Sequence, residues 1–240
     1  MIFYPAIDIK DGKCIRLEKG LLKNIKFYNE NPVDQAKQFE NDGCCWIHVV
    51  DIDGAFNGKP CNHEIIFKIK KNTNCKIQVG GGIRSIETIE KFLLNSIDRV
   101  ILGTVALKDP NFVIEACKKF PGKIAVGIDS RNNKVSINGW SKSSNVSTEE
   151  LVNKFEGAGV SAIIFTDINK DGLLKGMNFH QIKRLLKHTN IKIIASGGVS
   201  NIDDLKELKR INNNNLEGVI SGKALYEGKI LVSDAIKILS

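Results

Sequence analysis

The feature that most constrains the fold of this chain is an internal repeat of about half its length. Pro-Ala-Ile-Asp at 5–8 is echoed by Val-Gly-Ile-Asp at 126–129, near the middle of the chain. Three further pairs occur in the same order, and all eight matched segments end short apolar runs: Asp51 with Asp167, Gly81-Gly82 with Gly197-Gly198, and Gly103 with Gly222. An ordered set of matches of this kind indicates a duplicated half-domain.

Apolar runs rich in β-branched residues give the fold class. There are eight of them, at 2–9, 46–51, 76–80, 99–103, 124–129, 162–167, 192–196 and 218–222. They are continuous rather than alternating, which is typical of parallel strands buried on both faces, and helical stretches separate them. The sequence therefore predicts an α/β protein with one (β/α)8 TIM barrel over residues 1–240, made of half-barrels at about 1–120 and 121–240. An open doubly wound sheet is the alternative, but no G-x-G-x-x-G follows the first run.

Amino-acid composition limits the classes of partner that this chain can bind. The formal net charge is +8, yet only six of the 35 basic residues are arginines, which favours a lysine-rich solvated surface and an anionic small substrate over nucleic acid. The six cysteines form no C-x-x-C pair, and no metal site is indicated. The chain shows neither a secretion signal nor an apolar run of about 18 residues. We expect a cytoplasmic monomer with reduced thiols and no nucleic-acid or membrane partner.

Glycine clusters follow the third, fourth, seventh and eighth runs. Glycine lets the backbone approach a ligand closely, and amide groups at a helix start point toward an anion. Tight turns alone would explain a single glycine, but two paired clusters repeated by symmetry favour two phosphate sites, one at each end of a long ligand. The candidates are Gly81, Gly82, Gly103 and Thr104 in the first cluster, and Gly197, Gly198, Gly222 and Lys223 in the second.

Asp8 and Asp129 end the first and fifth runs, which lie across a barrel from each other. Each could cap a helix or pair with a lysine, but a symmetric pair facing the middle of a ligand is suited to general base and general acid catalysis. We interpret Asp51 and Asp167 as structural. Trp140 lies in a polar loop and could stack on a planar ring of the ligand. The four histidines show no pattern and are interpreted as core or surface residues.

Several segments together resemble a known family. They are Pro5-Ala-Ile-Asp8 through Arg16-Leu17, Val50-Asp51-Ile-Asp53-Gly54-Ala55, Gln78-Val-Gly80-Gly-Gly-Ile-Arg84, Gly127-Ile-Asp129, Gly139-Trp140, Phe165-Thr166-Asp167-Ile-x-x-Asp171-Gly172, Ala195-Ser-Gly-Gly198-Val and Gly222-Lys-Ala-Leu-Tyr226. The chain is similar over nearly its whole length to the phosphoribosylformimino-aminoimidazole carboxamide ribotide isomerases of histidine biosynthesis.

The resemblance implies a TIM barrel that performs an Amadori rearrangement, without metal or organic cofactor, on a substrate with two phosphoribosyl groups. It implies that Asp8 is the general base and Asp129 the general acid, with Asp171 as an alternative acid. By the same resemblance, Thr166 would bond the reacting ribose, Arg16 would contact the ligand and Trp140 would stack on the imidazole. Gly172 belongs to the ligand-binding motif that contains Asp171. The chain departs from the family at Glu18-Lys19-Gly20-Leu21 and at Leu173.

Three other functions remain open. The sister cyclase of the same pathway has Cys-Leu-Asp where this chain has Ala6-Ile7-Asp8. An isomerase that also accepts phosphoribosylanthranilate would use the same residues. A catalytically silent bisphosphate-binding or RNA-associated protein would show salt-dependent RNA binding without turnover.

Overall fold

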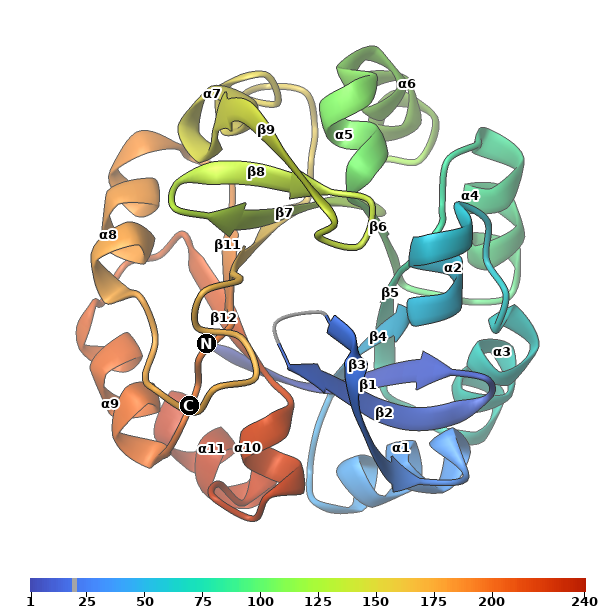
Figure 1. Cartoon of the computed structure of the whole chain (residues 1–240), viewed down its shortest axis with the longest axis vertical. Helices are drawn as coiled ribbons and strands as arrows, with labels where there is room; N and C mark the ends of the chain where they lie inside the picture. The colour runs from blue at the N-terminus through green and yellow to red at the C-terminus, as the bar shows by residue number, and fades with distance from the viewer. Residues whose placement is uncertain (19–20) are drawn as a thin grey trace.

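The computed structural model of the chain is a closed barrel of eight parallel strands surrounded by helices (Figure 1). It describes residues 1–18 and 21–240, and the side chains at 18 and 21–24 are also left out of the description. In ring order the barrel strands are β1 (Ile2–Lys10), β4 (Trp46–Asp51), β5 (Lys76–Gly80), β6 (Arg99–Leu102), β7 (Ile124–Arg131), β10 (Ala162–Asp167), β11 (Ile193–Ser196) and β12 (Leu216–Ser221). β12 pairs with β1 and closes the ring, so the predicted TIM barrel is confirmed and the open sheet is excluded.

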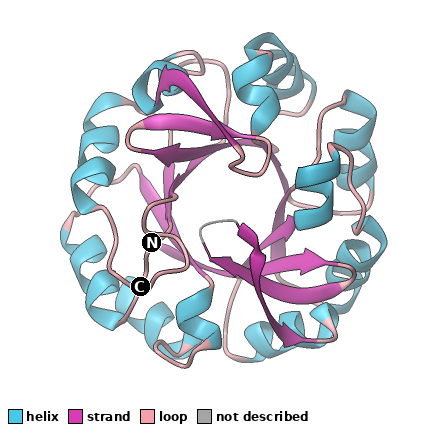
Figure 2. Ribbon diagram, viewed as in Figure 1, coloured by secondary structure: helices cyan, strands magenta, loops and turns pink. Residues whose placement is uncertain are grey.

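The helices form the outer layer, seen in cyan in Figure 2. They are α1 (Pro32–Asn41), α2 (Ile52–Asn57), α3 (His63–Asn72), α4 (Ile86–Leu94), α5 (Thr104–Lys108), α6 (Pro110–Lys119), α7 (Thr148–Asn153), α8 (Phe179–His188), α9 (Ile202–Arg210), α10 (Lys223–Tyr226) and α11 (Val232–Leu239). Local sequence sets their ends; for example, Asn31 accepts from the Val33 amide at 3.0 Å, with Pro32 as the first residue of α1. Within the described residues, no helix is long and apolar enough to cross a membrane.

Alternation along each strand produces two separate cores. Residues that face outward pack against the helices in one large cluster that includes Ile47, Val79 and Val126. Residues that face inward form a smaller cluster inside the barrel, among them Tyr4 and Ile164. The period of two also places the inward positions at the strand ends around one opening, where the loops after the strands lie.

Two β-hairpins extend from the barrel, and the sequence analysis did not anticipate either. β2 (Lys13–Glu18) and β3 (Leu21–Asn29) follow β1, whereas β8 (Lys134–Ile137) and β9 (Lys142–Ser147) follow β7. Asp11 and Gly12 form the first turn with φ of 49° and 75°, and Asn132 and Asn133 form the second with φ of 51° and 61°. Two successive residues with positive φ are typical of the two-residue turn that joins tightly twisted strands. In Figure 1 the hairpins lie on opposite sides of the barrel opening.

The hairpins preserve the repeat. Asp8 pairs with Ile15 of β2, and Asp129 pairs with Ser136 of β8, at the same distance from the two turns. Each of these aspartates therefore lies where a barrel strand continues into its hairpin. The chain departs from the family sequence pattern at residues 18–21 and at Leu173, and two residues of the first segment, Lys19 and Gly20, lie outside the described residues.

Candidate active site

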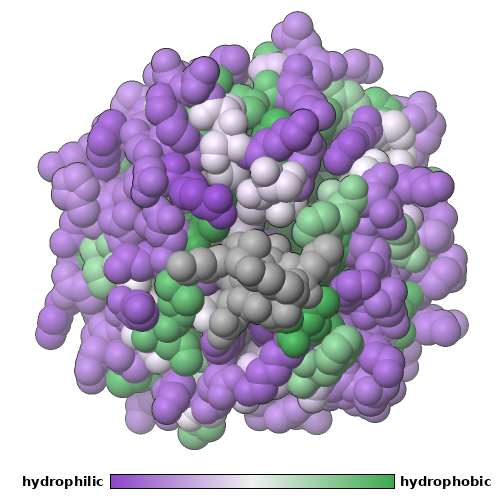
Figure 3. Space-filling view, in the orientation of Figure 1, coloured by the Kyte–Doolittle hydropathy of each residue, from purple (hydrophilic) through white to green (hydrophobic). Residues whose placement is uncertain are grey.

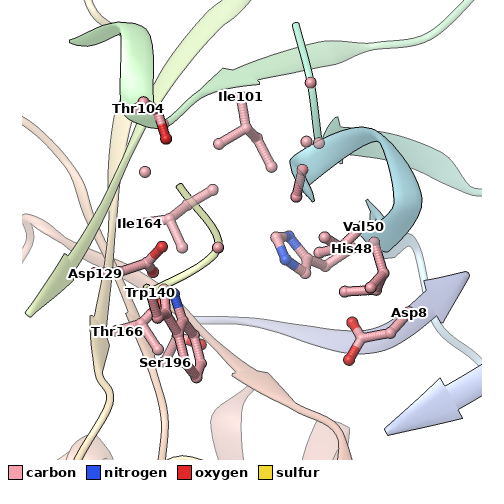
Figure 4. A pocket seen from close by; sticks show the side chains of 18 of the residues that line it. Asp8, His48, Val50, Ile101, Thr104, Asp129, Trp140, Ile164, Thr166 and Ser196 are labelled. Atoms are coloured by element: carbon pink, nitrogen blue, oxygen red, sulfur yellow. The ribbon is translucent and has the colours of Figure 1, made fainter. Parts of the chain in front are cut away.

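The C-terminal ends of the barrel strands surround a cavity of about 220 Å³. Residues from both halves line it, and Figure 4 shows Asp8 and Asp129 entering it from opposite sides. A smaller pocket adjoins this cavity and shares Arg16, Asp171 and Ser196 with it. The structure thus brings the sequence-predicted carboxylates and both glycine clusters around two adjoining pockets.

Asp8 is held by an ion pair with Arg16. Arg16 follows Ile15, the register partner of Asp8 on β2, and its Nη1 lies 2.6 Å from Oδ2 of Asp8. The two side chains are only 14% and 12% exposed. Burial raises the pKa of the Asp8 carboxyl, and the charge and hydrogen bond of Arg16 oppose that rise. The pair can therefore keep a carboxylate in an apolar cavity.

Asp129 has two hydrogen-bonding neighbours from different elements. Burial raises the pKa of its carboxyl, whereas hydrogen bonds from the side chains of Trp140 and Thr166 oppose the rise. Thr166 is on β10, directly beside Asp129 in the strand register. Trp140 lies in the turn between β8 and β9 with a φ of 68° and reaches the carboxylate from above the barrel (Figure 4). Donors of this kind favour the ionised form.

Asp171 lies in the loop after β10 and lines both pockets. Burial raises the pKa of Asp171 to about 6; Arg16 opposes the rise, and the negative charges of Asp8 and Asp129 add to it. Three carboxyl groups thus interact in one cavity. Like charges at this separation disfavour simultaneous ionisation of all three.

The first glycine cluster is shaped by backbone contacts. At Gly81, where φ is 112°, a Cβ atom would overlap the backbone oxygen of Asp51, and at Gly82, where φ is 75°, it would overlap that of Gly54. Gly103 is different, because a Cβ there would meet nothing within 4 Å. The next residue, Thr104, lines the cavity and accepts a hydrogen bond from the Asn138 amide at 3.0 Å, which joins this cluster to the second hairpin.

The second cluster surrounds the smaller pocket. A Cβ on Gly197 or Gly198 would lie 2.7 Å from the backbone oxygen of Asp167 or Gly176, respectively. The guanidinium of Arg16 lies against Gly222, in the space that a Cβ atom at Gly222 would occupy, so a side chain there would displace it. Two further residues predicted to bind the ligand, Lys223 and Gly172, also lie at the smaller pocket, where Lys223 Nζ donates to the Gly172 oxygen at 2.9 Å.

Asp51 and Asp167 are structural, as predicted. Asp51 is fully buried and accepts hydrogen bonds from the Gly54 amide at 2.8 Å and from the amide and side chain of Asn62. Asp167 accepts from the Asn169 amide at 2.9 Å and from Asn178 Nδ2 at 2.7 Å. Both carboxylates organise the loops that follow their strands.

Sequence reasoning missed some of the residues that line the two pockets. His48, interpreted from the sequence as a core or surface residue, lines the main cavity (Figure 4). Arg84, which stands two residues after Gly82 in the segment of the first glycine cluster, also lines it. Ser221 lines the smaller pocket, and its buried hydroxyl has no hydrogen-bond partner in the part of the chain that the structure describes.

The face that carries the opening is mainly hydrophilic. In Figure 3 polar residues cover most of the periphery of this face, and several hydrophobic residues lie nearer its centre. The large exposed hydrophobic side chains among the described residues are scattered: Phe27, Phe56, Leu94 and Leu231.

Comparison with known proteins gives a consistent set of relatives. Residues 2–231 match a family model described as histidine biosynthesis protein. A protein of Brucella anthropi is 49% identical over 239 residues, covering 100% of this chain and 98% of the relative. Proteins of Allorhizobium ampelinum and Rhizobium meliloti are 49% and 48% identical, over 100% of this chain and 98% and 97% of the relatives. All three are named 1-(5-phosphoribosyl)-5-((5-phosphoribosylamino)methylideneamino) imidazole-4-carboxamide isomerase.

Proposed function

The chain belongs to the family of histidine biosynthesis proteins, and on that premise we propose that it is the aldose–ketose isomerase of this pathway. Its substrate is phosphoribosylformimino-aminoimidazole carboxamide ribotide, and its product is the phosphoribulosyl isomer. The reaction is an Amadori rearrangement, in which protons move within one molecule and no atom is gained or lost. The protein therefore has to hold the two ends of the substrate and move protons at the sugar between them.

One observation carries this proposal: a single cavity contains Asp8, Asp129 and Asp171 between two glycine clusters. The clusters belong to opposite halves of the barrel and are suited to phosphate groups, because amide groups and small side chains let an anion approach closely. A substrate with a phosphate at each end fits this arrangement, and its sugar would then lie among the carboxyl groups.

We assign the general base to Asp8. Burial raises its pKa, and its ion pair with Arg16 opposes that rise and stabilises the carboxylate. As the base it would take the proton from C2 of the opened ribose. The electron pair of that C–H bond would form the C1=C2 double bond of the enaminol while the electrons of the C1=N bond move onto nitrogen. Loss of the proton from the C2 hydroxyl, which restores the acid, and return of a proton to C1 complete the ketose.

We assign the general acid to Asp171 rather than to Asp129. An acid must carry its proton near neutral pH, and Asp171 has a pKa of about 6 that burial and two negative neighbours raise. Burial raises the pKa of Asp129 as well, but there two hydrogen bonds oppose the rise, and no negative neighbour in the described part of the chain adds to it. At Asp171, in contrast, Arg16 opposes a rise to which Asp8 and Asp129 add. In this arrangement the negative charge of Asp129 helps to raise the pKa of Asp171. Asp171 donates its proton to the ring oxygen when the furanose opens.

Around the reacting sugar, Thr166 and Trp140 would orient Asp129, and Trp140 would also offer an aromatic surface to the imidazole. We also propose a monomer, since only four large hydrophobic side chains are exposed among the described residues. We further propose a cytoplasmic location, in keeping with the six free cysteines.

The test is a spectroscopic assay of the purified protein with the formimino-ribotide substrate and, separately, with phosphoribosylanthranilate. Turnover of the first substrate, at a kcat/KM above about 10⁴ M⁻¹s⁻¹, is the expected result. Failure to convert it would overturn the proposal. Conversion of both substrates would establish a broader isomerase with the same chemistry.

A further inference from the structure

A chain of polar side chains crosses the barrel interior below the cavity and ends at His48. Tyr4 donates to Glu217 Oε1 at 2.6 Å, and Arg99 Nη1 donates to the same oxygen at 2.9 Å. Arg99 Nη1 also donates to Gln78 Oε1 at 3.2 Å, and Gln78 Nε2 lies 3.1 Å from Nδ1 of His48. The five side chains come from β1, β12, β6, β5 and β4, so the chain depends on the closed barrel.

The direction of these hydrogen bonds can be worked out from their chemistry. A guanidinium can only donate, so the amide group that Arg99 contacts must present its oxygen there. The amino end of Gln78 then faces His48, and it too can only donate. Nδ1 of His48 must therefore accept, which leaves the ring proton on Nε2. This chain of hydrogen bonds, called the relay below, thus fixes one tautomer of the imidazole.

His48 projects this fixed ring into the substrate cavity (Figure 4). Ala6 of β1 is its partner in the strand register, two residues before Asp8. The imidazole therefore lies on the neighbouring strand, one layer below the proposed general base. None of the described residues forms a hydrogen bond with Nε2, so its N–H is available to a ligand.

We propose that His48 is a substrate-binding residue whose Nε2–H donates to an oxygen of the reacting sugar, and that Gln78 is the positioning residue that fixes this donor. The inference rests on the proposed function and extends it. A donor fixed in this way selects for an oxygen acceptor at this point of the ligand and against an N–H group, because two donors would face each other.

The electrostatics agree with a donor rather than an acid or base. Burial, with a further effect from the Arg16 charge, lowers the pKa of His48 to about 3. The ring therefore stays neutral over the pH range in which the carboxyl groups act, and the proton on Nε2 is retained. His48 takes no part in the proton transfers assigned to Asp8 and Asp171.

The tautomer can be measured directly in the ligand-free protein by nitrogen NMR after labelling of histidine with ¹⁵N. His48→Gln assigns the signals among the four histidines. We expect an unprotonated Nδ1 and a protonated Nε2. A protonated Nδ1, or a mixture of both tautomers, would overturn the relay.

Gln78→Glu reverses the relay with little change in volume. The new carboxylate can only accept, so Nδ1 of His48 becomes protonated and Nε2 of the neutral ring loses its proton and its donor role. We expect the nitrogen signals to change accordingly and kcat/KM to fall at least about tenfold, the size of one lost hydrogen bond in a buried site. Gln35→Glu is the matched control, because it adds a carboxylate at a buried glutamine of α1 outside the barrel.

A reversed tautomer with unchanged kcat/KM would show that the donor does not act on the substrate. A second pair of variants covers the possibility that Gln78→Glu fails to fold. His48→Gln keeps an N–H near the position of Nε2, whereas His48→Asn keeps one only near Nδ1. We expect the Gln variant to retain at least about tenfold more kcat/KM than the Asn variant, and equal losses would overturn the proposal.

The same assay measures turnover by the wild type. If the wild type shows no turnover, the proposed function and the proposed contact of His48 with the sugar are both overturned. The tautomer of His48 is still determined, because that measurement needs no substrate.

Discussion

At the residue scale, the three carboxyl groups differ in their neighbours rather than in their chemistry. Burial raises the pKa of all three; Arg16 opposes the rise at Asp8, and two hydrogen-bonding side chains oppose it at Asp129. At Asp171, Arg16 opposes the rise while Asp8 and Asp129 add to it. The added negative neighbours are the reason that we assign the proton to Asp171. Two predictions test this division.

Asp8→Asn should abolish turnover while leaving substrate binding nearly intact. General-base catalysis typically contributes about 10²- to 10⁴-fold, so kcat should fall by that amount, whereas a ground-state contact would change KM. Steady-state kinetics and ligand titration measure the two effects separately. Asp11→Asn is the control, because that side chain is 72% exposed at the turn of the same hairpin. A variant that kept more than about a tenth of the wild-type kcat would contradict the base assignment.

The pH dependence of kcat/KM tests the acid. Asp171 must be protonated and Asp8 ionised in the free enzyme, so kcat/KM should fall at low pH, where Asp8 gains a proton, and it should also fall as the pH rises through about 6. Asp129→Asn removes a negative charge that raises the pKa of Asp171, so this falling limb should move to lower pH while turnover persists. Complete loss of turnover in Asp129→Asn, together with an unshifted limb in Asp171→Asn, would instead make Asp129 the acid.

At the element scale, the strand ends were predictable and the hairpins were not. Eight continuous apolar runs located the barrel strands because burial on both faces leaves a strong signal. β2, β3, β8 and β9 mix polar and apolar residues and are more easily interpreted as loops, although Asp11-Gly12 was a clear hairpin signal. As a result, the sequence placed Trp140 in a loop but did not indicate that a hairpin holds it over Asp129.

The role of His48 could not have been predicted for a related reason. It depends on Gln78 and Arg99 from neighbouring strands, and a single histidine in one strand carries no information about partners that only barrel closure brings together. The aspartates were identified because the repeat marks them twice, and His48 has no counterpart in that repeat.

Gly103→Ala tests the first phosphate site at the level of the loop. The added Cβ would meet nothing within 4 Å, and φ is already negative, so the free energy of unfolding should change by less than about 1 kcal/mol. A phosphate on this loop would meet the new methyl group, and KM should rise about tenfold with kcat retained. Denaturant unfolding and steady-state kinetics check the two expectations.

Gly81→Ala provides the contrast, because its Cβ would overlap the backbone of Asp51 at a φ of 112°. That variant should lose stability by more than about 1 kcal/mol whatever the ligand does. If Gly103→Ala lowered kcat and left KM unchanged, the loop would have no role in phosphate binding.

At the scale of the whole molecule, duplication of a half-barrel explains why the site has two ends. β1 and β7 carry the aspartates and hairpins, while Gly103 and Gly222 precede the short helices α5 and α10 in matching positions. The halves have also diverged, because Gly222 lies under Arg16 whereas Gly103 is open. Two sites for the same chemical group, at a fixed separation, should bind a two-phosphate ligand in a cooperative way.

Calorimetric titration distinguishes this arrangement from a single anion pocket. Inorganic phosphate should bind at two weak sites per chain, and the bisphosphate product should bind once. Because the second phosphate of the product is held near its site by the first, its affinity should exceed that of free phosphate by about 10²- to 10⁴-fold. Gly103→Ala should remove one of the two phosphate sites and leave the other, since the second cluster lies in the opposite half of the barrel. A single phosphate site in the wild type would contradict the two-ended site and the substrate proposed from it.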